Sequence, residues 1–126
     1  MKAVTFGLVL FLVMVCASCG GRVGTQIGFG RCILVDLGIE QVENEMSSVH
    51  GLRSFSFIAA GESGERYYRG MYGEANLFFE LVDVQQSTKV YVKSHSSLDD
   101  VNSVMGLIQA QLRRSNVEFA RADFDR

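Results

Sequence analysis

Two segments of the chain repeat apolar residues in steps of three and four, which brings the side chains to one face of a helix. The first stripe consists of Val35, Ile39, Val42, Met46 and Val49, and the second of Leu98, Val101, Met105, Ile108 and Leu112. The pattern predicts helices over 36–49 and 98–114.

Residues at the ends of these segments support both predictions. Ser97 followed by Asp100 is typical of a helix N-terminus, and Asp36 can cap the first turn of the other helix. Gly51 and Asn116 are suited to the positions where the two helices stop. An alternative for the first segment is that residues 31–37 begin as a strand.

Between the two helices, short apolar runs alternate with turn residues, which is typical of antiparallel strands. Phe55, Phe57 and Ala59 are predicted to share one face of an alternating strand, with Ser54 and Ser56 on the other. The predicted strands are Leu52–Ala60, Glu65–Tyr72, Leu77–Val84 and Lys89–His95. The segment from Val117 to Phe124 can add a fifth strand, with Val117 and Phe119 facing inward.

Each helix has one apolar stripe and each strand has one strongly apolar face, so both helices can cover the same face of the sheet. The expected fold class is α+β. It is a two-layer sandwich of a four- to five-stranded antiparallel meander with two amphipathic helices on one face. The expected order is α-β-β-β-β-α, with a possible final β-strand. Tyr67, Arg69, Tyr91 and Lys93 fall on the opposite face of the sheet.

The N-terminus has the features of an export signal. Met1 and Lys2 precede an uncharged run of 13 residues, Ala3–Val15. That run suits a signal peptide and is shorter than the span of about 18 residues needed to cross a bilayer.

The next four residues, Cys16-Ala17-Ser18-Cys19, resemble the lipobox of bacterial lipoproteins. Ala17 and Ser18 match the two small positions, and Cys16 stands where Leu is usual. The resemblance covers about 20 residues and implies that the chain is cut before Cys19, which is then acylated and anchors the protein. Gly20 follows Cys19, and by resemblance to enterobacterial-type sorting this implies the outer membrane, facing the periplasm, rather than the inner membrane.

These features divide the chain into a signal peptide (1–18), a lipidated Cys19 with a Gly-rich tether (19–31) and one α+β domain (32–126). An ordinary secretory cut after Ala17 is the alternative, and Cys19 and Cys32 could then form a disulfide in a soluble secreted protein. An uncleaved anchor or no export also stays open. With Cys19 lipidated, Cys32 is expected to be buried as a small apolar residue.

Composition narrows the function classes. The chain of 126 residues carries 12 basic and 14 acidic residues, and loss of Lys2 with the signal leaves 11 basic residues. A slightly acidic chain of this kind has no basic face for phosphate backbones, so no nucleic-acid partner is expected.

Residues that could carry chemistry are few. Cys32 and His95 are the most economical nucleophile and base, but nothing in the sequence brings them together. Glu80 and Asp83 fall on opposite faces of an apolar strand, so one of them is expected to point toward the helices and to need a partner there. No metal-ligand spacing or phosphate-binding loop is found, so no metal, cofactor or catalytic residue is expected.

The expected function is that of a membrane-anchored, non-catalytic binding or assembly module in the bacterial cell envelope, with an envelope protein as its unidentified partner. Tyr67, Arg69, Tyr91 and Lys93 form the candidate partner surface, because Tyr91 shares one side of its strand with the charged Lys89 and Lys93, and Tyr67 shares a side with Arg69 in the same way. The alternative is cross-strand packing of the same residues. A soluble secreted binding protein or inhibitor is the second hypothesis, and a small exported enzyme is the third.

Overall fold

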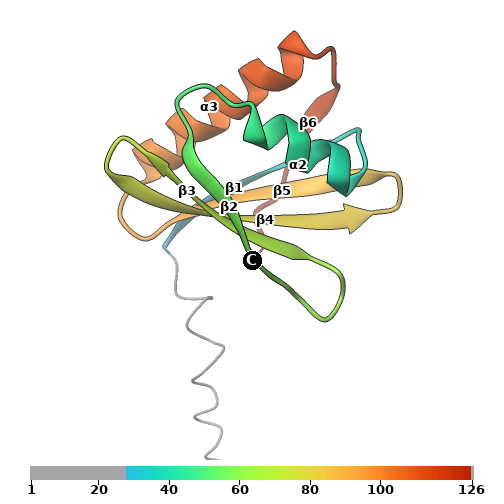
Figure 1. The fold of residues 1–126 in the computed structure, drawn as a ribbon, viewed down its shortest axis with the longest axis horizontal. Coiled ribbons are helices and arrows are strands. Elements are labelled where there is room, and N and C mark those ends of the chain that lie inside the picture. Colours follow the sequence, from blue (N-terminus) through green and yellow to red (C-terminus); the bar gives the residue numbers. More distant parts are fainter. Residues whose placement is uncertain (1–27, 126) are drawn as a thin grey trace, which may run out of the picture.

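The computed structural model describes residues 28–125, which form one six-stranded sheet and two helices (Figure 1). In chain order, the elements are β1 (Phe29–Val35), α2 (Ile39–Ser47), β2 (Arg53–Ala60), β3 (Arg66–Tyr72), β4 (Ala75–Val84), β5 (Ser87–Ser94), α3 (Leu98–Arg114) and β6 (Phe119–Ala122).

The sheet is antiparallel throughout, with the strand order β2-β3-β4-β5-β1-β6. Strands β2 to β5 form a meander joined by short turns, whereas β1 and β6 come from the two ends of the described chain. Strands β1, β4 and β5, which contain most of the buried strand residues, lie inside the sheet. The strongly apolar segment predicted to be central is therefore confirmed as an interior strand.

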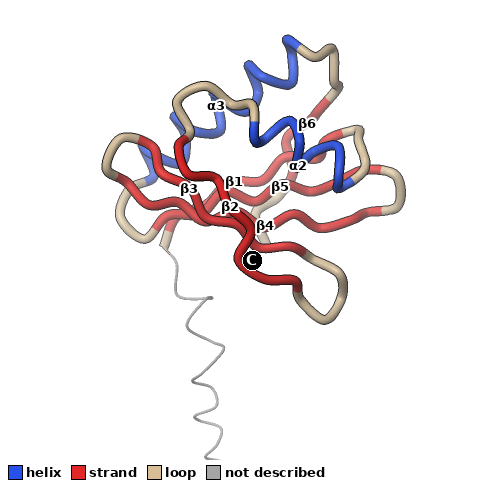
Figure 2. Tube along the Cα trace, viewed as in Figure 1, coloured by secondary structure: helices blue, strands red, loops and turns tan. Residues whose placement is uncertain are grey.

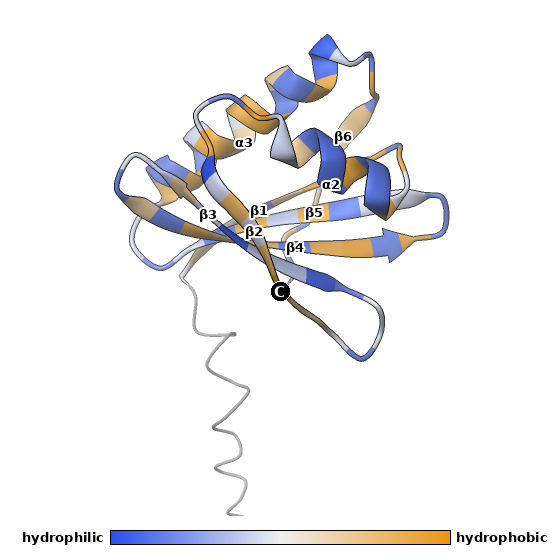
Figure 3. Cartoon of the chain, viewed as in Figure 1, coloured by the Kyte–Doolittle hydropathy of each residue, from blue (hydrophilic) through white to orange (hydrophobic). Residues whose placement is uncertain are grey.

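Both helices cover the same face of the sheet (Figure 2), which we call the helix face. Each helix carries hydrophobic and hydrophilic residues (Figure 3), and its apolar stripe packs into the core. Helix α3 lies against β1 and β5, and α2 lies against β4 and β5. The buried residues at the centre of this core include Val35, Val42, Met46, Leu77, Phe79, Leu81, Val90, Val92, Val104 and Ile108. No helix within residues 28–125 is long and apolar enough to cross a membrane.

The predicted α+β class is confirmed, but the predicted order is incomplete at its start. A strand, β1, precedes the first helix, and α2 begins at Ile39 rather than at Asp36. Residues 31–35 belong to β1 because backbone pairing with both β5 and β6 is available to them. The Asp36 amide extends this pairing and donates to the carbonyl oxygen of Glu118 at 2.9 Å, so Asp36 does not cap the helix.

The second helix and its ends match the prediction. Helix α3 spans 98–114, and the Ser97 hydroxyl accepts a hydrogen bond from the Asp100 amide at 3.2 Å. Asn116 has a φ of 58°, a left-handed conformation that ends a helix. The final strand is confirmed in a shorter form, 119–122, and Val117 and Phe119 pack against the core.

The predicted alternation along β2 is only partly correct. Phe55 and Phe57 both lie against the ring of Tyr68 on the helix face, at 4.8 and 5.6 Å between ring centroids. A register shift between Phe57 and Ala59 then pairs Ala59 with Tyr67, which puts Ala59 on the other face. The extra residue of a β-bulge, invisible in the apolar pattern, causes this reversal.

Candidate functional site

The four residues predicted as a partner surface lie on the sheet face away from the helices, which we call the open face. In the strand register, Tyr67 pairs with Glu80, and Glu80 pairs with Tyr91. The next row joins Arg69, Phe78 and Lys93 in the same way. Paired residues share a face of a sheet, so the four side chains form two pairs, on β3 and on β5, with β4 between them.

The β5 pair is not exposed as expected. Tyr91 has only 1% of its surface accessible. The chain turns under the sheet after β6, and its C-terminus lies on the side opposite the helices (Figure 1). There the ring of Phe124 packs edge-on against Tyr91 at 6.0 Å, and the Tyr91 hydroxyl donates to Asp125 Oδ1 at 2.7 Å. The expectation that Tyr91 is a surface residue is therefore wrong, because the C-terminal segment 123–125 covers it.

Two residues of β1, Gly30 and Cys32, belong to the same covered region. Gly30 is buried, and a side chain added there would meet the Phe124 ring at 2.2 Å. Cys32 pairs with Tyr91 across the strands and is 4% exposed, as predicted for a small buried residue. Gly30 lies in the segment that the sequence assigned to a tether. Its place under Phe124 makes it part of the domain.

Lys93 and Glu80 form an ion pair on the open face. The Lys93 Nζ donates to Glu80 Oε1 at 2.9 Å, with side-chain exposures of 12% and 3%. A buried carboxylate is tolerated only with compensating charge and hydrogen bonds. Lys93 therefore compensates the charge of Glu80. The expectation that a helix-facing carboxylate needs a partner is wrong, because the buried carboxylate, Glu80, lies on the open face. Asp83, the other carboxylate, is exposed.

The β3 pair lies in the half of the open face that the C-terminal segment does not cover. Arg69 is exposed and Tyr67 is half-buried, with its hydroxyl donating to Glu65 Oε2 at 3.1 Å. Met71 and Phe78 are half-buried beside them. We call these four residues, Tyr67, Arg69, Met71 and Phe78, the β3–β4 patch. No described helix or strand lies over the patch.

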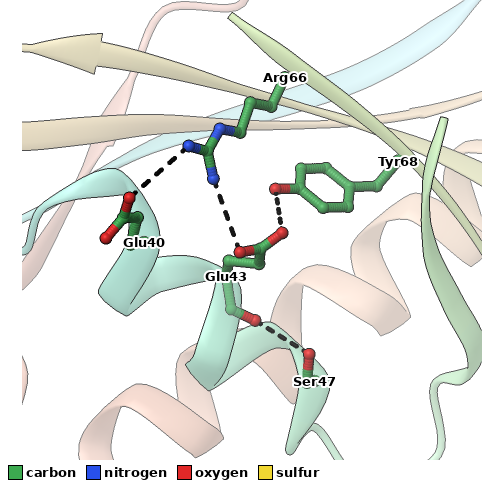
Figure 4. Close-up of polar contacts among 5 residues, drawn as sticks. All are labelled: Glu40, Glu43, Ser47, Arg66 and Tyr68. Carbon is green, nitrogen blue, oxygen red and sulfur yellow. Dashed lines mark hydrogen bonds and ion pairs between the residues drawn. The ribbon is translucent and has the colours of Figure 1, made fainter. Parts of the chain in front are cut away.

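A second polar cluster holds α2 to the helix face (Figure 4). The Tyr68 hydroxyl donates to Glu43 Oε2 at 2.7 Å, and Arg66 lies 3.6 Å from Glu43 Oε1 and 3.9 Å from Glu40. Burial, and then the hydrogen bond to Glu43, raises the pKa of Tyr68 from 10.0 to about 12. This cluster links β3 to α2, and Tyr68 is 1% exposed within it. The cluster therefore stabilises the packing of α2 on the sheet.

The other residues considered for chemistry are dispersed. His50 and His95 are exposed, and the His95 ring contacts Phe78 at 5.6 Å. Within the described part of the chain, no group of three or more His, Cys, Asp or Glu side chains is placed to hold a metal ion. Cys16 and Cys19 lie outside the described residues, so the lipidation site remains a prediction.

Sequence reasoning missed the participation of Glu80, Phe124 and Asp125. Glu80 could have been placed on the open face, because it shares the even positions of its strand with Phe78 and Val82. The signal at the C-terminus is weaker. An aromatic residue between two aspartates, Asp123 and Asp125, does not show which strand it covers.

No protein-family model matches the chain, and no curated protein matches it in sequence.

Proposed function

We propose that this chain is a lipid-anchored protein of the bacterial cell envelope, a non-catalytic module that binds an envelope protein through the β3–β4 patch. The anchor rests on the lipobox resemblance and on acylation of Cys19. Gly20 after that cysteine favours the outer membrane, with the domain in the periplasm.

The observation that carries the binding role is the contrast within the open face. One half is covered by the chain's own C-terminal segment, and the other presents an exposed Arg69 beside half-buried Tyr67, Met71 and Phe78. An apolar centre with an arginine and a tyrosine is the composition of protein interfaces.

The segment between the proposed anchor and the domain is short enough to keep the domain near the membrane surface. Nine residues, 20–28, separate Cys19 from the first residue of β1. Even fully extended, they reach only about 30 Å. A partner of the anchored domain is thus itself in or near the membrane.

The alternative is a soluble secreted binding protein or inhibitor with a Cys19–Cys32 disulfide. The position of Cys32 speaks against it. The thiol is 4% exposed on a strand with neighbours on both sides, so a bridge would require Cys19 to enter a packed region. The intact mass of the processed protein separates the two forms: a diacylglycerol-sized increment on Cys19 supports the anchor, whereas the loss of two hydrogens supports the disulfide.

The anchor is tested by Cys19→Ala. This change should move the protein from the membrane fraction to the soluble fraction, because one acylated cysteine is the only proposed attachment. A variant that stays with the membranes would show that the uncleaved apolar run, Ala3–Val15, is the anchor instead.

The partner surface is tested by photo-crosslinking in intact cells. A photoreactive residue at Arg69 should give a discrete cross-linked product, which Tyr67→Ser and Met71→Ser should weaken. The matched control is the same residue at Ser103, which is exposed on α3. Equal products from both positions would contradict a specific surface on the β3–β4 patch.

A further inference from the structure

A hollow lies on the helix face, between α3 and the end of the sheet formed by β1 and β6. It has a volume of about 170 Å³, room for about five water molecules at about 30 Å³ each. Its polar lining consists of Arg31 from β1, Arg121 from β6, and Asn102 and Gln109 from α3. We call it the arginine groove.

The strand register explains why both arginines enter this groove. Arg121 pairs with Ile33, a core residue of the helix face, so it faces the helices. Arg31 stands two residues before Ile33 on β1 and therefore points the same way. Gly106 of α3 also lines the groove, and a side chain added there would meet no atom within 4 Å. The absence of a side chain on α3 leaves the groove open.

The charge of the groove is not balanced by the residues that the structure describes. No acidic residue lines it, and neither arginine takes part in an ion pair within residues 28–125. Asp123 lines an adjoining hollow of about 340 Å³ together with both arginines, but it lies beyond ion-pair distance of them. Two guanidinium groups in one hollow repel each other unless an anion lies between them.

We infer that the arginine groove binds a phosphate group. Guanidinium groups present forked donors that match phosphate oxygens, and the two amide side chains can donate further hydrogen bonds. The floor of the groove includes the buried Met105 and Ile33, whereas both arginines are exposed, so the guanidinium groups are accessible to a phosphate from solvent.

The phosphate can come from solution or from a lipid headgroup. Arg31 follows the start of β1 by two residues, so it lies at the end of the domain next to the proposed tether. A headgroup as the source depends on the proposed membrane anchor, whereas phosphate binding itself does not. Titration with inorganic phosphate tests phosphate binding alone, and titration with lipid vesicles tests the headgroup as its source.

The first experiment titrates inorganic phosphate into the processed full-length chain in detergent, at constant ionic strength, and follows the arginine side-chain NMR signals. The signals of Arg31 and Arg121 should shift and saturate, and chloride should not reproduce the effect. Arg31→Ala and Arg121→Ala should each weaken phosphate binding about tenfold or more. Arg114→Ala, which removes an equal charge from an exposed site at the end of α3, should leave the affinity within about twofold.

A second pair of variants changes the groove without removing an arginine. Gly106→Glu introduces a carboxylate that competes for the arginines and should abolish phosphate binding. Gly106→Gln has nearly the same size without the charge and should retain more of the binding. Both replace a glycine within a helix by a better helix former, so the fold is expected to persist. Loss of phosphate binding in Arg114→Ala to the same extent as in Arg31→Ala would overturn the inference.

The third experiment identifies the source of the phosphate. Shifts of Arg31 and Arg121 with phosphatidylglycerol–phosphatidylcholine vesicles, but not with phosphatidylcholine alone, would support a lipid headgroup. Shifts with inorganic phosphate only would support a soluble anion. No saturable shift with either probe would overturn the inference. Absence of a lipid on Cys19 would contradict the proposed anchor and leave the phosphate result unaffected.

Discussion

Strands β3 and β5 carry similar sequence patterns on the same face of the sheet, yet the structure treats them differently. Tyr67 and Arg69 stay accessible on β3, whereas Tyr91 is 1% exposed on β5 and Lys93 is committed to Glu80. The difference does not come from the strands. It comes from three residues at the chain terminus, 123–125, which cover β5 and β1 and leave β3 uncovered.

An aromatic residue that alternates with cations along a strand is therefore not necessarily exposed. A lysine can point inward when a carboxylate on the neighbouring strand needs it, as Glu80 needs Lys93. Arg69 and Lys93 both pair with Phe78, but Lys93 forms an ion pair with Glu80, whereas Arg69 is exposed and forms no ion pair within residues 28–125.

The largest expected contrast is between the two tyrosines. Tyr91→Ser removes a buried ring and its hydrogen bond to Asp125, and should lower the free energy of unfolding by about 3–5 kcal/mol. Tyr67→Ser, on the uncovered half, should cost less than about 1 kcal/mol. Urea unfolding followed by circular dichroism measures both. Similar costs at the two positions would show that the two halves of the open face are equally packed.

The two cations provide the next contrast. Lys93→Ala leaves Glu80 buried without its ion-pair partner and should cost about 3 kcal/mol. Arg69→Ala removes an exposed side chain and should change stability by no more than about 0.5 kcal/mol. Replacing both members of the buried pair, Lys93→Met with Glu80→Leu, should recover most of the loss. If the double variant is no more stable than Lys93→Ala, the ion pair is not the reason for the cost.

The packing of the C-terminal segment 123–125 over β5 and β1 can be weakened at Phe124. Phe124→Ala should cost about 2 kcal/mol, less than a fully buried phenylalanine because its ring is only partly buried. Gly30→Ala should displace the same ring, because the added carbon would lie 2.2 Å from it. The two substitutions should therefore be less than additive in a double-mutant cycle. Additive costs would show that Gly30 and Phe124 act independently.

The smallest contrast sets Tyr68 against its sequence neighbour Tyr67, which faces the other way. Tyr68→Phe removes the hydrogen bond to Glu43 and should cost about 1.5 kcal/mol near neutral pH. Because the folded state raises the pKa of Tyr68 from 10.0 to about 12, its protonated form is favoured by folding. The stabilisation is present below pH 10.0 and is lost as the pH rises towards about 12.

The pH dependence is measured as a difference between variants. Wild type should lose stability more steeply than Tyr68→Phe between these two pH values, and Tyr67→Phe is the comparison that removes a tyrosine hydroxyl from the other face. Parallel curves for wild type and Tyr68→Phe would contradict a raised pKa at this position.

The sequence alone determined the two helical stripes, the meander and the α+β class, because periodicities of 3.6 and 2 report directly on which side chains face the core. It also placed the limits of α3, since Ser97 and Asn116 act through local backbone geometry. It offered a strand over residues 31–37 only as an alternative, because the partners of β1 are more than 50 residues away in β5 and more than 80 away in β6.

The candidate sites depended on the tertiary structure more than the fold did. The alternation of side chains along a strand placed Tyr67, Arg69, Tyr91 and Lys93 on one face. Only the path of the C-terminal segment decided which pair is covered. Only the register of β6 against β1 brought Arg121 beside Arg31. Local pattern determines which way a side chain points, whereas burial and pairing depend on segments distant in sequence. Those segments meet only when the chain folds.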